Sequence, residues 1–322
     1  MHRRALLAAA SLLALPAVQA QTVWPTQPVK IVVPTGPGSS LDLIVRLMSD
    51  KLAARWGQAV VVDNKPGAGG LLGMDVVAKA GDGHTIGIGF NGPLAYAPFL
   101  YAKLPYDPAR DLKAIVMTTS QANVLAINAE KVPARTVAEF VAWAKAQGGK
   151  MNYSSLGQGS SAHLTMELFL SEAGLQAVHV PFNGSPPAAF AVAQGTADAS
   201  FMVAPALLPH LQSGKVRMIA ISASAKPDNL RDLPSLAEAG YPKVEALAWN
   251  GLVGPASISD AAVARINADV NELLAKDSAL RDAMAKSGLT VVGGSAAEFR
   301  RFIDADVARW GPVITRLGIK LN

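Results

Sequence analysis

The 322-residue chain contains no cysteine. Disulfides, thiolate nucleophiles and cysteine-bound metals are therefore excluded, and an exported form would depend on a large hydrophobic core for its stability. The chain also lacks the basic runs and the basic–aromatic interleaving that are typical of nucleic-acid binding. Its 29 Lys and Arg residues exceed its 24 Asp and Glu residues only slightly, for a net charge of +5. This mild excess predicts no nucleic-acid partner but would favour small anionic ligands.

Apolar runs long enough to cross a bilayer are lacking as well. The longest apolar stretch, residues 5–18, is shorter than the roughly 20 residues that a membrane-spanning helix needs. It follows His2, Arg3 and Arg4 and precedes small residues at positions 18–20. This layout is typical of a cleaved secretory signal peptide, which we assign to residues 1–20. We therefore expect the mature protein to be exported and soluble.

Strand-like and helix-like runs alternate in the first 90 residues. β-Branched runs predict strands, and apolar residues at helical spacing, as in Leu41, Ile44, Val45 and Met48, predict helices. The predicted strands are 29–33, 59–62 and 85–90, and the predicted helices are 41–57 and 71–80. This alternation is typical of an α/β fold with a mostly parallel sheet and helices on both faces.

The pattern then starts again. Two apolar strands at 114–117 and 124–127 flank the polar segment SQAN (120–123), which we interpret as a crossing between two lobes; a strand at 244–253 would cross back. Between and after these crossings we expect strands at 151–154, 177–180, 199–203 and 216–221, and helices at 136–147, 260–287 and 296–317. The predicted domains are lobe 1 (21–121 and 248–322) and lobe 2 (122–247).

Four strand-to-helix loops share one composition. Each combines glycine, which allows close approach of the backbone, with hydroxyl or amide groups at a helix start, where the helix dipole favours an anion. These loops are 35–40, 91–93, 154–161 and 183–185. They could hold a carboxylate without arginine. The alternative is that they are ordinary helix caps and turns, which favour the same residues.

Other chemistry has weaker support in the sequence. Gly159-Ser160-Ser161-Ala162-His163 approaches the G-x-S-x-G motif of serine hydrolases, but a histidine replaces the small final residue. His163 and Glu167 would share a helix face, yet two ligands do not make a metal site. Asp198 could bond a ligand or fix a loop. We therefore expect no enzyme activity, cofactor or metal, with a secreted hydrolase using Ser161 as the alternative.

An ordered series of segments from Trp24 almost to the C-terminus resembles one family. The segments include KIVVPTGPGSSLDLIVRLMSDKL, VVVDNKPGAGGLLGMDVVAKA, NYSSLGQGSSAHLTMELF, VPFNGSPPA and LPSLAEAGYP. They are similar to the Bug-type (TctC-like) periplasmic receptors of tripartite tricarboxylate transporters. The resemblance implies a type II periplasmic binding fold with two α/β lobes. These would close on an organic acid, which is then delivered to a membrane permease; a membrane sensor is an alternative partner.

The resemblance also implies the positions of the site. Residues 35–42 match the family's first carboxylate-binding loop, and the other loops match further positions of the cleft. The family loop usually reads P-F-P-P-G-G, whereas Thr35, Gly36 and Ser39 replace its aromatic residue, a proline and the second glycine. These departures leave the ligand open among di- and tricarboxylates, aromatic acids and amino acids.

Together these observations predict a monomeric periplasmic solute-binding receptor for a small organic carboxylate. The predicted ligand-binding residues are Thr35, Gly36, Gly38, Ser39, Ser40, Asn91, Gly92, Ser155, Gly159, Ser160, Ser161, Asn183, Gly184 and Asp198.

Overall fold

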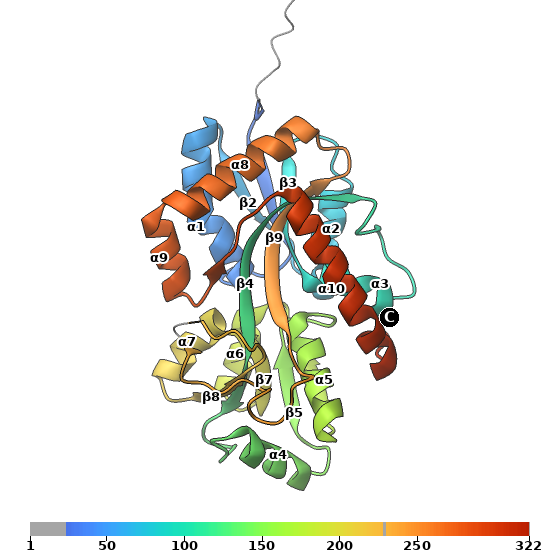
Figure 1. Cartoon of the computed structure of the whole chain (residues 1–322), viewed down its shortest axis with the longest axis vertical. Coiled ribbons are helices and arrows are strands. Elements are labelled where there is room, and N and C mark those ends of the chain that lie inside the picture. Colours follow the sequence, from blue (N-terminus) through green and yellow to red (C-terminus); the bar gives the residue numbers. More distant parts are fainter. Residues whose placement is uncertain (1–23, 228–229, 322) are drawn as a thin grey trace, which may run out of the picture.

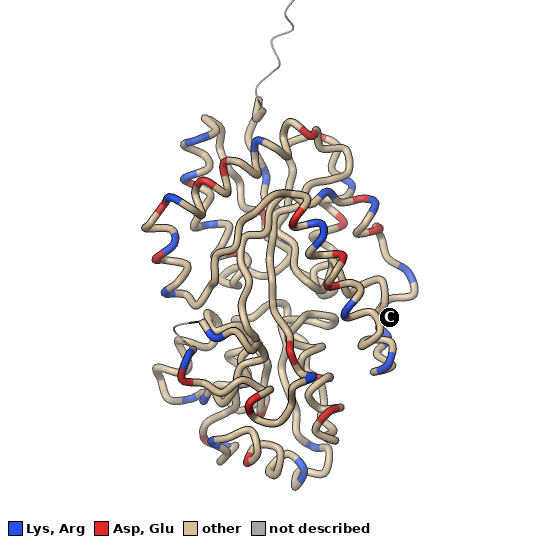
Figure 2. The backbone as a smooth tube through the Cα atoms, viewed as in Figure 1, with Lys and Arg blue, Asp and Glu red and all other residues tan. Residues whose placement is uncertain are grey.

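The computed structural model describes residues 24–227 and 230–321; the predicted signal peptide lies outside this range. The described chain forms two lobes, each a sheet with helices on both faces, and two long strands run from one lobe into the other (Figure 1). Basic and acidic residues are interspersed over both lobes (Figure 2). Within the described ranges, no helix is long and apolar enough to span a membrane.

The sheet of the first lobe begins with three parallel strands. β1 lies between β2 and β3, and β9 pairs antiparallel with β3 and with the first part of β4, to which β10 adds a short edge. The strands are β1 (Val29–Val33), β2 (Val60–Asn64), β3 (Thr85–Phe90), β4 (Leu112–Asn128), β9 (Leu247–Pro255) and β10 (Thr290–Val291).

The sheet of the second lobe shares β4. The second part of β4 pairs antiparallel with β7 and β8, and β5 lies parallel between β7 and β6. The additional strands are β5 (Asn152–Ser155), β6 (Val178–Pro181), β7 (Ala199–Val203) and β8 (Val216–Ile221). In both lobes, the parallel strands point their carboxyl ends toward the other lobe, as the contacts between their loops show below.

β4 differs from the sequence-based expectation. The two strands predicted around SQAN are one strand of 17 residues. Ser120 to Ala122 pair with Trp249 to Leu247 of β9, and Asn123 pairs with Val203 of β7, so the ladder continues through the polar segment. Its side chains are polar but largely buried, so polarity here does not mark a loop. The segment does pass from one sheet to the other; the exact lobe boundaries stay a prediction.

The helices cover each sheet on two faces. α1, α8 and α9 bury apolar side chains on one face of the first sheet, and α2, η2, α3 and α10 cover the other. Their bounds are α1 (Ser40–Trp56), η1 (Ala68–Gly70), α2 (Leu71–Ala78), η2 (Gly92–Tyr96), α3 (Ala97–Leu100), α8 (Asp260–Lys276), α9 (Ser278–Lys286) and α10 (Ala296–Leu317). The single helix predicted over 260–287 is divided at Asp277, whose side chain caps the start of α9.

The second lobe repeats this layering. α4 and α5 pack on one face and α6 and α7 on the other; they are α4 (Val137–Ala146), α5 (Ser161–Ala173), α6 (Ser185–Ala193) and α7 (Ala204–Gln212). One apolar cluster contains Phe169 of α5, Leu125 of β4 and Trp310 of α10. The core is therefore continuous between the lobes on the side of α5 and α10.

Candidate functional site

The first site loop joins β1 to α1. Ser39 is the N-cap of α1: its hydroxyl accepts a hydrogen bond from the Asp42 amide at 3.3 Å and lies 2.6 Å from the Thr35 hydroxyl. The Asp42 carboxylate accepts from the Gly38 amide at 2.9 Å and from Asn64 at 3.0 Å. These bonds hold the loop in one shape and occupy the Ser39 hydroxyl.

Asp42 also forms an ion pair with Arg46 at 2.9 Å. Burial raises the pKa of the Asp42 carboxyl, but the hydrogen bonds from Arg46, Gly38 and Asn64 outweigh it, and the pKa lies below its ordinary value. Asp42 is therefore ionised at neutral pH, and its charge is compensated within the loop rather than offered to a ligand.

The second loop joins β5 to α5 and is built in the same way. Ser160 is the N-cap of α5: its hydroxyl accepts from the His163 amide at 3.3 Å and donates to the Gly157 carbonyl at 2.7 Å. The Gly159 amide donates to Nδ1 of His163 at 3.1 Å. His163 thus bonds nearby backbone.

Two stacked imidazoles support this second loop. The rings of His163 and His179 lie 4.1 Å apart, and the Tyr153 ring stacks on His179 at 4.8 Å. Nε2 of His179 lies 2.7 Å from the Ser155 hydroxyl. Burial lowers the pKa of His163 to about 3 and that of His179 to about 4. Both rings are therefore neutral at physiological pH.

The residue that follows the N-cap of α1 or α5 has a different environment from the N-cap itself. Ser40 and Ser161 are the first residues of α1 and α5, and their side chains are buried, with residue exposures of 7% and 3%. Within the described residues, neither hydroxyl has a hydrogen-bond partner, nor do the amides of Ser40, Leu41, Ser161 and Ala162. Unpaired donors at two helix starts, where the dipoles add positive potential, are suited to an anion.

The loops of the two lobes touch. A Cβ atom at Gly36 would lie 3.0 Å from the Asn183 carbonyl oxygen, and one at Gly92 would lie 3.0 Å from that of Gly159. Gly184 also approaches Gly36, and Gly38 approaches α6. The structure thus brings residues of all four predicted loops to the junction between the lobes.

A fifth loop at this junction was missed by the sequence analysis. Gly69, in the loop between β2 and α2, lies so close to Gln158 that an added Cβ would stand 2.2 Å from the Gln158 carbonyl oxygen. Gly69 also has φ +62°, a conformation that favours glycine. The glycine-rich composition of residues 67–70 allows this close backbone contact.

Asn91 is fully engaged within the first lobe. Its amide donates to Tyr96, to the Leu247 carbonyl and to Asp306, at 2.9 to 3.2 Å, and its oxygen accepts from the Trp249 amide at 3.1 Å. Burial raises the pKa of the Asp306 carboxyl, although its hydrogen bonds with Trp249 and Asn91 partly oppose this. Asn91 therefore fixes the end of β3 to β9 and α10, and its predicted contact with a ligand stays a prediction.

Asp198 is not brought to the junction. It precedes β7, and its carboxylate accepts from the amide of Asn152, the first residue of β5, at 2.9 Å. β5 and β7 are parallel, so Asp198 lies at the amino edge of this sheet, opposite the loop after Ser155. Of the two roles considered for Asp198, the structure supports fixing the backbone.

Ser161 lacks the partners of a hydrolytic nucleophile. In the described chain its hydroxyl has no hydrogen bond to a histidine, since Nδ1 of His163 faces Gly159 and Nε2 of His179 faces Ser155. Among the described residues, no group of three or more His, Cys, Asp or Glu could hold a metal ion.

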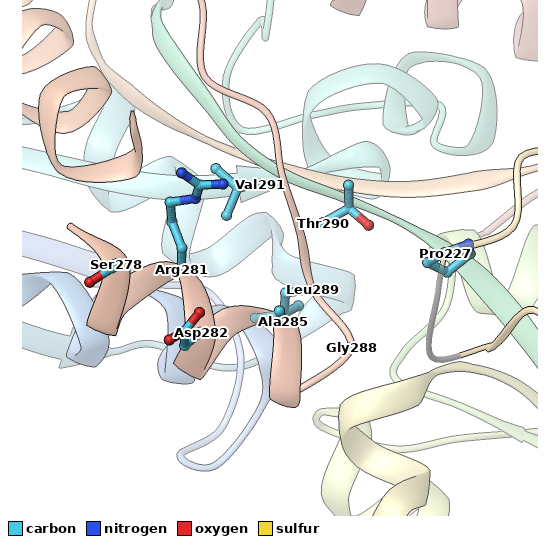
Figure 3. A pocket seen from close by; sticks show the side chains of 9 residues that line it. All are labelled: Pro227, Ser278, Arg281, Asp282, Ala285, Gly288, Leu289, Thr290 and Val291. Carbon is cyan, nitrogen blue, oxygen red and sulfur yellow. The ribbon is translucent and has the colours of Figure 1, made fainter. Parts of the chain in front are cut away.

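One groove lies away from this junction. It has a volume of about 740 Å³ and is lined by α9, β10 and Pro227, including Arg281, Asp282 and Thr290 (Figure 3). None of the predicted ligand-binding residues lines it, so we do not assign the ligand site there.

A family model described as the tripartite tricarboxylate transporter family receptor, TctC, matches residues 44–319. This chain belongs to that family. The receptor is 33% identical over 301 residues to Protein BugT of Bordetella pertussis, covering 93% of this chain and 92% of BugT. It resembles a solved R. palustris protein with adipate (31% identity, TM-score 0.88, 92% and 100% of the chains covered). It also resembles MatC from Rhodopseudomonas palustris with bound malate (29% identity, TM-score 0.85, 90% and 100% covered).

These similarities confirm two sequence-based predictions for the receptor. Solved periplasmic binding proteins share its two-lobed α/β fold, which confirms the predicted fold class. The predicted family, identified from the ordered segments, is confirmed as well. The family consists of solute-binding receptors rather than enzymes.

Proposed function

We propose that this receptor captures a small organic carboxylate at the junction of its two lobes and delivers it to the membrane permease of a tripartite tricarboxylate transporter. It would act in the periplasm as a monomer, after removal of residues 1–20. The proposal is carried by one observation: the first residues of α1 and α5 present unpaired hydroxyl and amide donors next to the loops that meet between the lobes.

The geometry favours a carboxylate for a physical reason. Two helix starts provide neutral donors and partial positive charge, and Asp42, the ionised group nearby, is already paired with Arg46. One carboxylate could accept from Ser40, Ser161 and the adjacent amides together, which would hold the lobes closed. That two relatives were solved with adipate and with malate supports an acid of this size.

The proposal is tested by calorimetry on the mature chain with adipate, malate, citrate, benzoate and glutamate. We expect at least one acid to bind. Ser40→Ala and Ser161→Ala should each weaken binding by about 0.5–1.5 kcal/mol, the usual net contribution of one hydrogen bond, without loss of thermal stability. Absence of binding to the whole panel would refute the proposal. Unchanged affinity in both variants would remove these hydroxyls from the site.

A further inference from the structure

Two amide side chains lie buried on the strand that connects the lobes. Gln121 and Asn123 of β4 are 4% and 1% exposed, yet Oε1 of Gln121 and Oδ1 of Asn123 have no hydrogen-bond partner. Buried polar atoms are paired in the great majority of cases, because an unpaired one loses its hydration without compensation. In the described parts of the chain only five buried side-chain atoms are unpaired, and these two are separated by a single residue.

The orientation of Asn123 follows from its neighbour on α5. Its amide nitrogen donates to the Thr165 hydroxyl at 3.1 Å. The Asn123 oxygen is then left as an acceptor. Thr165 is also one turn after Ser161, on the same face of α5.

The position of the two amides relates them to the site loops. Asn123 pairs with Val203, the last residue of β7, and therefore lies at the carboxyl edge of the second sheet, where the loop before Ser161 begins. Gln121, two residues earlier, points to the same side of β4 and pairs with Ala248. The next residue of β9, Trp249, is bonded by Asn91 at the end of β3. Both amides thus lie on β4 where it passes from the first sheet to the second.

We infer that Gln121 and Asn123 form a second subsite that accepts a hydrogen bond from a hydroxyl group of the ligand. This inference rests on the proposed function, since it assumes that the loops hold the carboxylate of the same molecule. Two carbonyl oxygens attract a hydroxyl donor and repel a second carboxylate. An acid without the hydroxyl would leave both oxygens unpaired. The receptor should therefore prefer hydroxycarboxylic acids to their deoxy analogues.

The test compares acids that differ by one hydroxyl: malate with succinate, 3-hydroxybutyrate with butyrate, and citrate with tricarballylate. Calorimetry on the wild-type mature chain should show about tenfold tighter binding of the hydroxy acid in at least one pair, equivalent to roughly 1.4 kcal/mol. Asn123→Leu and Gln121→Met, which keep similar volumes, should reduce this preference to below about threefold.

Ser200→Ala is the matched control. The Ser200 hydroxyl is also buried and unpaired. Ser200 is in register with Ser154, whose hydroxyl donates to the Ala188 carbonyl of α6. Ser200 therefore lies on the sheet face opposite to the one that carries Asn123. This variant should keep the wild-type preference. Thermal unfolding of each variant confirms its fold. The inference would be overturned if the wild-type protein bound both members of every bound pair with equal affinity. It would also be overturned if the preference survived in both amide variants. Neither result would overturn the proposed function. Absence of binding to all six acids would overturn the inference, and the proposed function would fall with it only if adipate, benzoate and glutamate also did not bind.

Discussion

Gly36→Ala should oppose closure of the lobes without disturbing either lobe. The added Cβ would meet one atom within 4 Å, the Asn183 carbonyl oxygen of the other lobe, at 3.0 Å. Ordinary contacts begin near 3.4 Å, so the loops must separate by a few tenths of an ångström. Overpacking of this kind costs about 1–3 kcal/mol. If binding requires the closed form, the Kd should rise about 5- to 150-fold.

Gly81→Ala is the matched control, because a Cβ there meets no atom within 4 Å. Both substitutions restrict the unfolded chain equally, which adds about 0.4–1 kcal/mol to the free energy of unfolding. Neither substitution should therefore lower the Tm of the unliganded protein. Calorimetry gives the Kd, and X-ray scattering with saturating acid gives the radius of gyration. Wild-type affinity and compaction in Gly36→Ala would refute the idea that binding requires this contact.

Three further predictions concern the capping serines, the histidines and Asn91. Ser39→Ala and Ser160→Ala should each destabilise the fold by about 0.5–2 kcal/mol through loss of an N-cap, measured by urea unfolding; unchanged stability would contradict the capping role. The pKa values of His163 and His179 lie at about 3 and about 4, below the unfolded value near 6.5. Between these pH values the unfolded chain therefore binds more protons than the folded chain. The contribution of the two neutral histidines to the free energy of unfolding should be fully present above about pH 6.5 and decline toward pH 4. A free energy of unfolding that does not change over this pH range would argue against the neutral pair. Asn91→Ala should lower the free energy of unfolding by about 2–4 kcal/mol, because it leaves buried partners unpaired; a loss below 1 kcal/mol would contradict its structural role.

Local sequence patterns located the loops but not the individual contacts within them. Ser39 and Ser160 were predicted to bind the ligand, and the structure uses their hydroxyls as N-caps. The two roles require the same residue type at a helix start, so composition alone does not separate them. The unpaired hydroxyls belong to Ser40 and Ser161, one position after the N-caps. This difference is seen only once the partner of each hydroxyl is known.

The remaining differences arise from pairing between distant segments. The family resemblance implied that Asp198 lies in the cleft, but the direction of β7 puts it at the far edge of the sheet. Gln121 and Asn123 were interpreted as part of a polar separator, because local polarity resembles a loop. Gln121 pairs with β9, more than 120 residues later, and Asn123 pairs with β7. Strand periodicity predicts a strand and says nothing of its neighbours.

The late position of β9 in the sequence has a consequence for the order in which the two sheets can form. All strands of the second sheet lie within residues 112–221, whereas the first sheet also needs β9 at 247–255 and β10 at 290–291. The second sheet can therefore be completed first. Until β9 emerges, β3 and the first part of β4 each have an unpaired edge, and such edges invite aggregation. An unfolded chain should thus depend most on a chaperone until β9 has paired with β3 and β4.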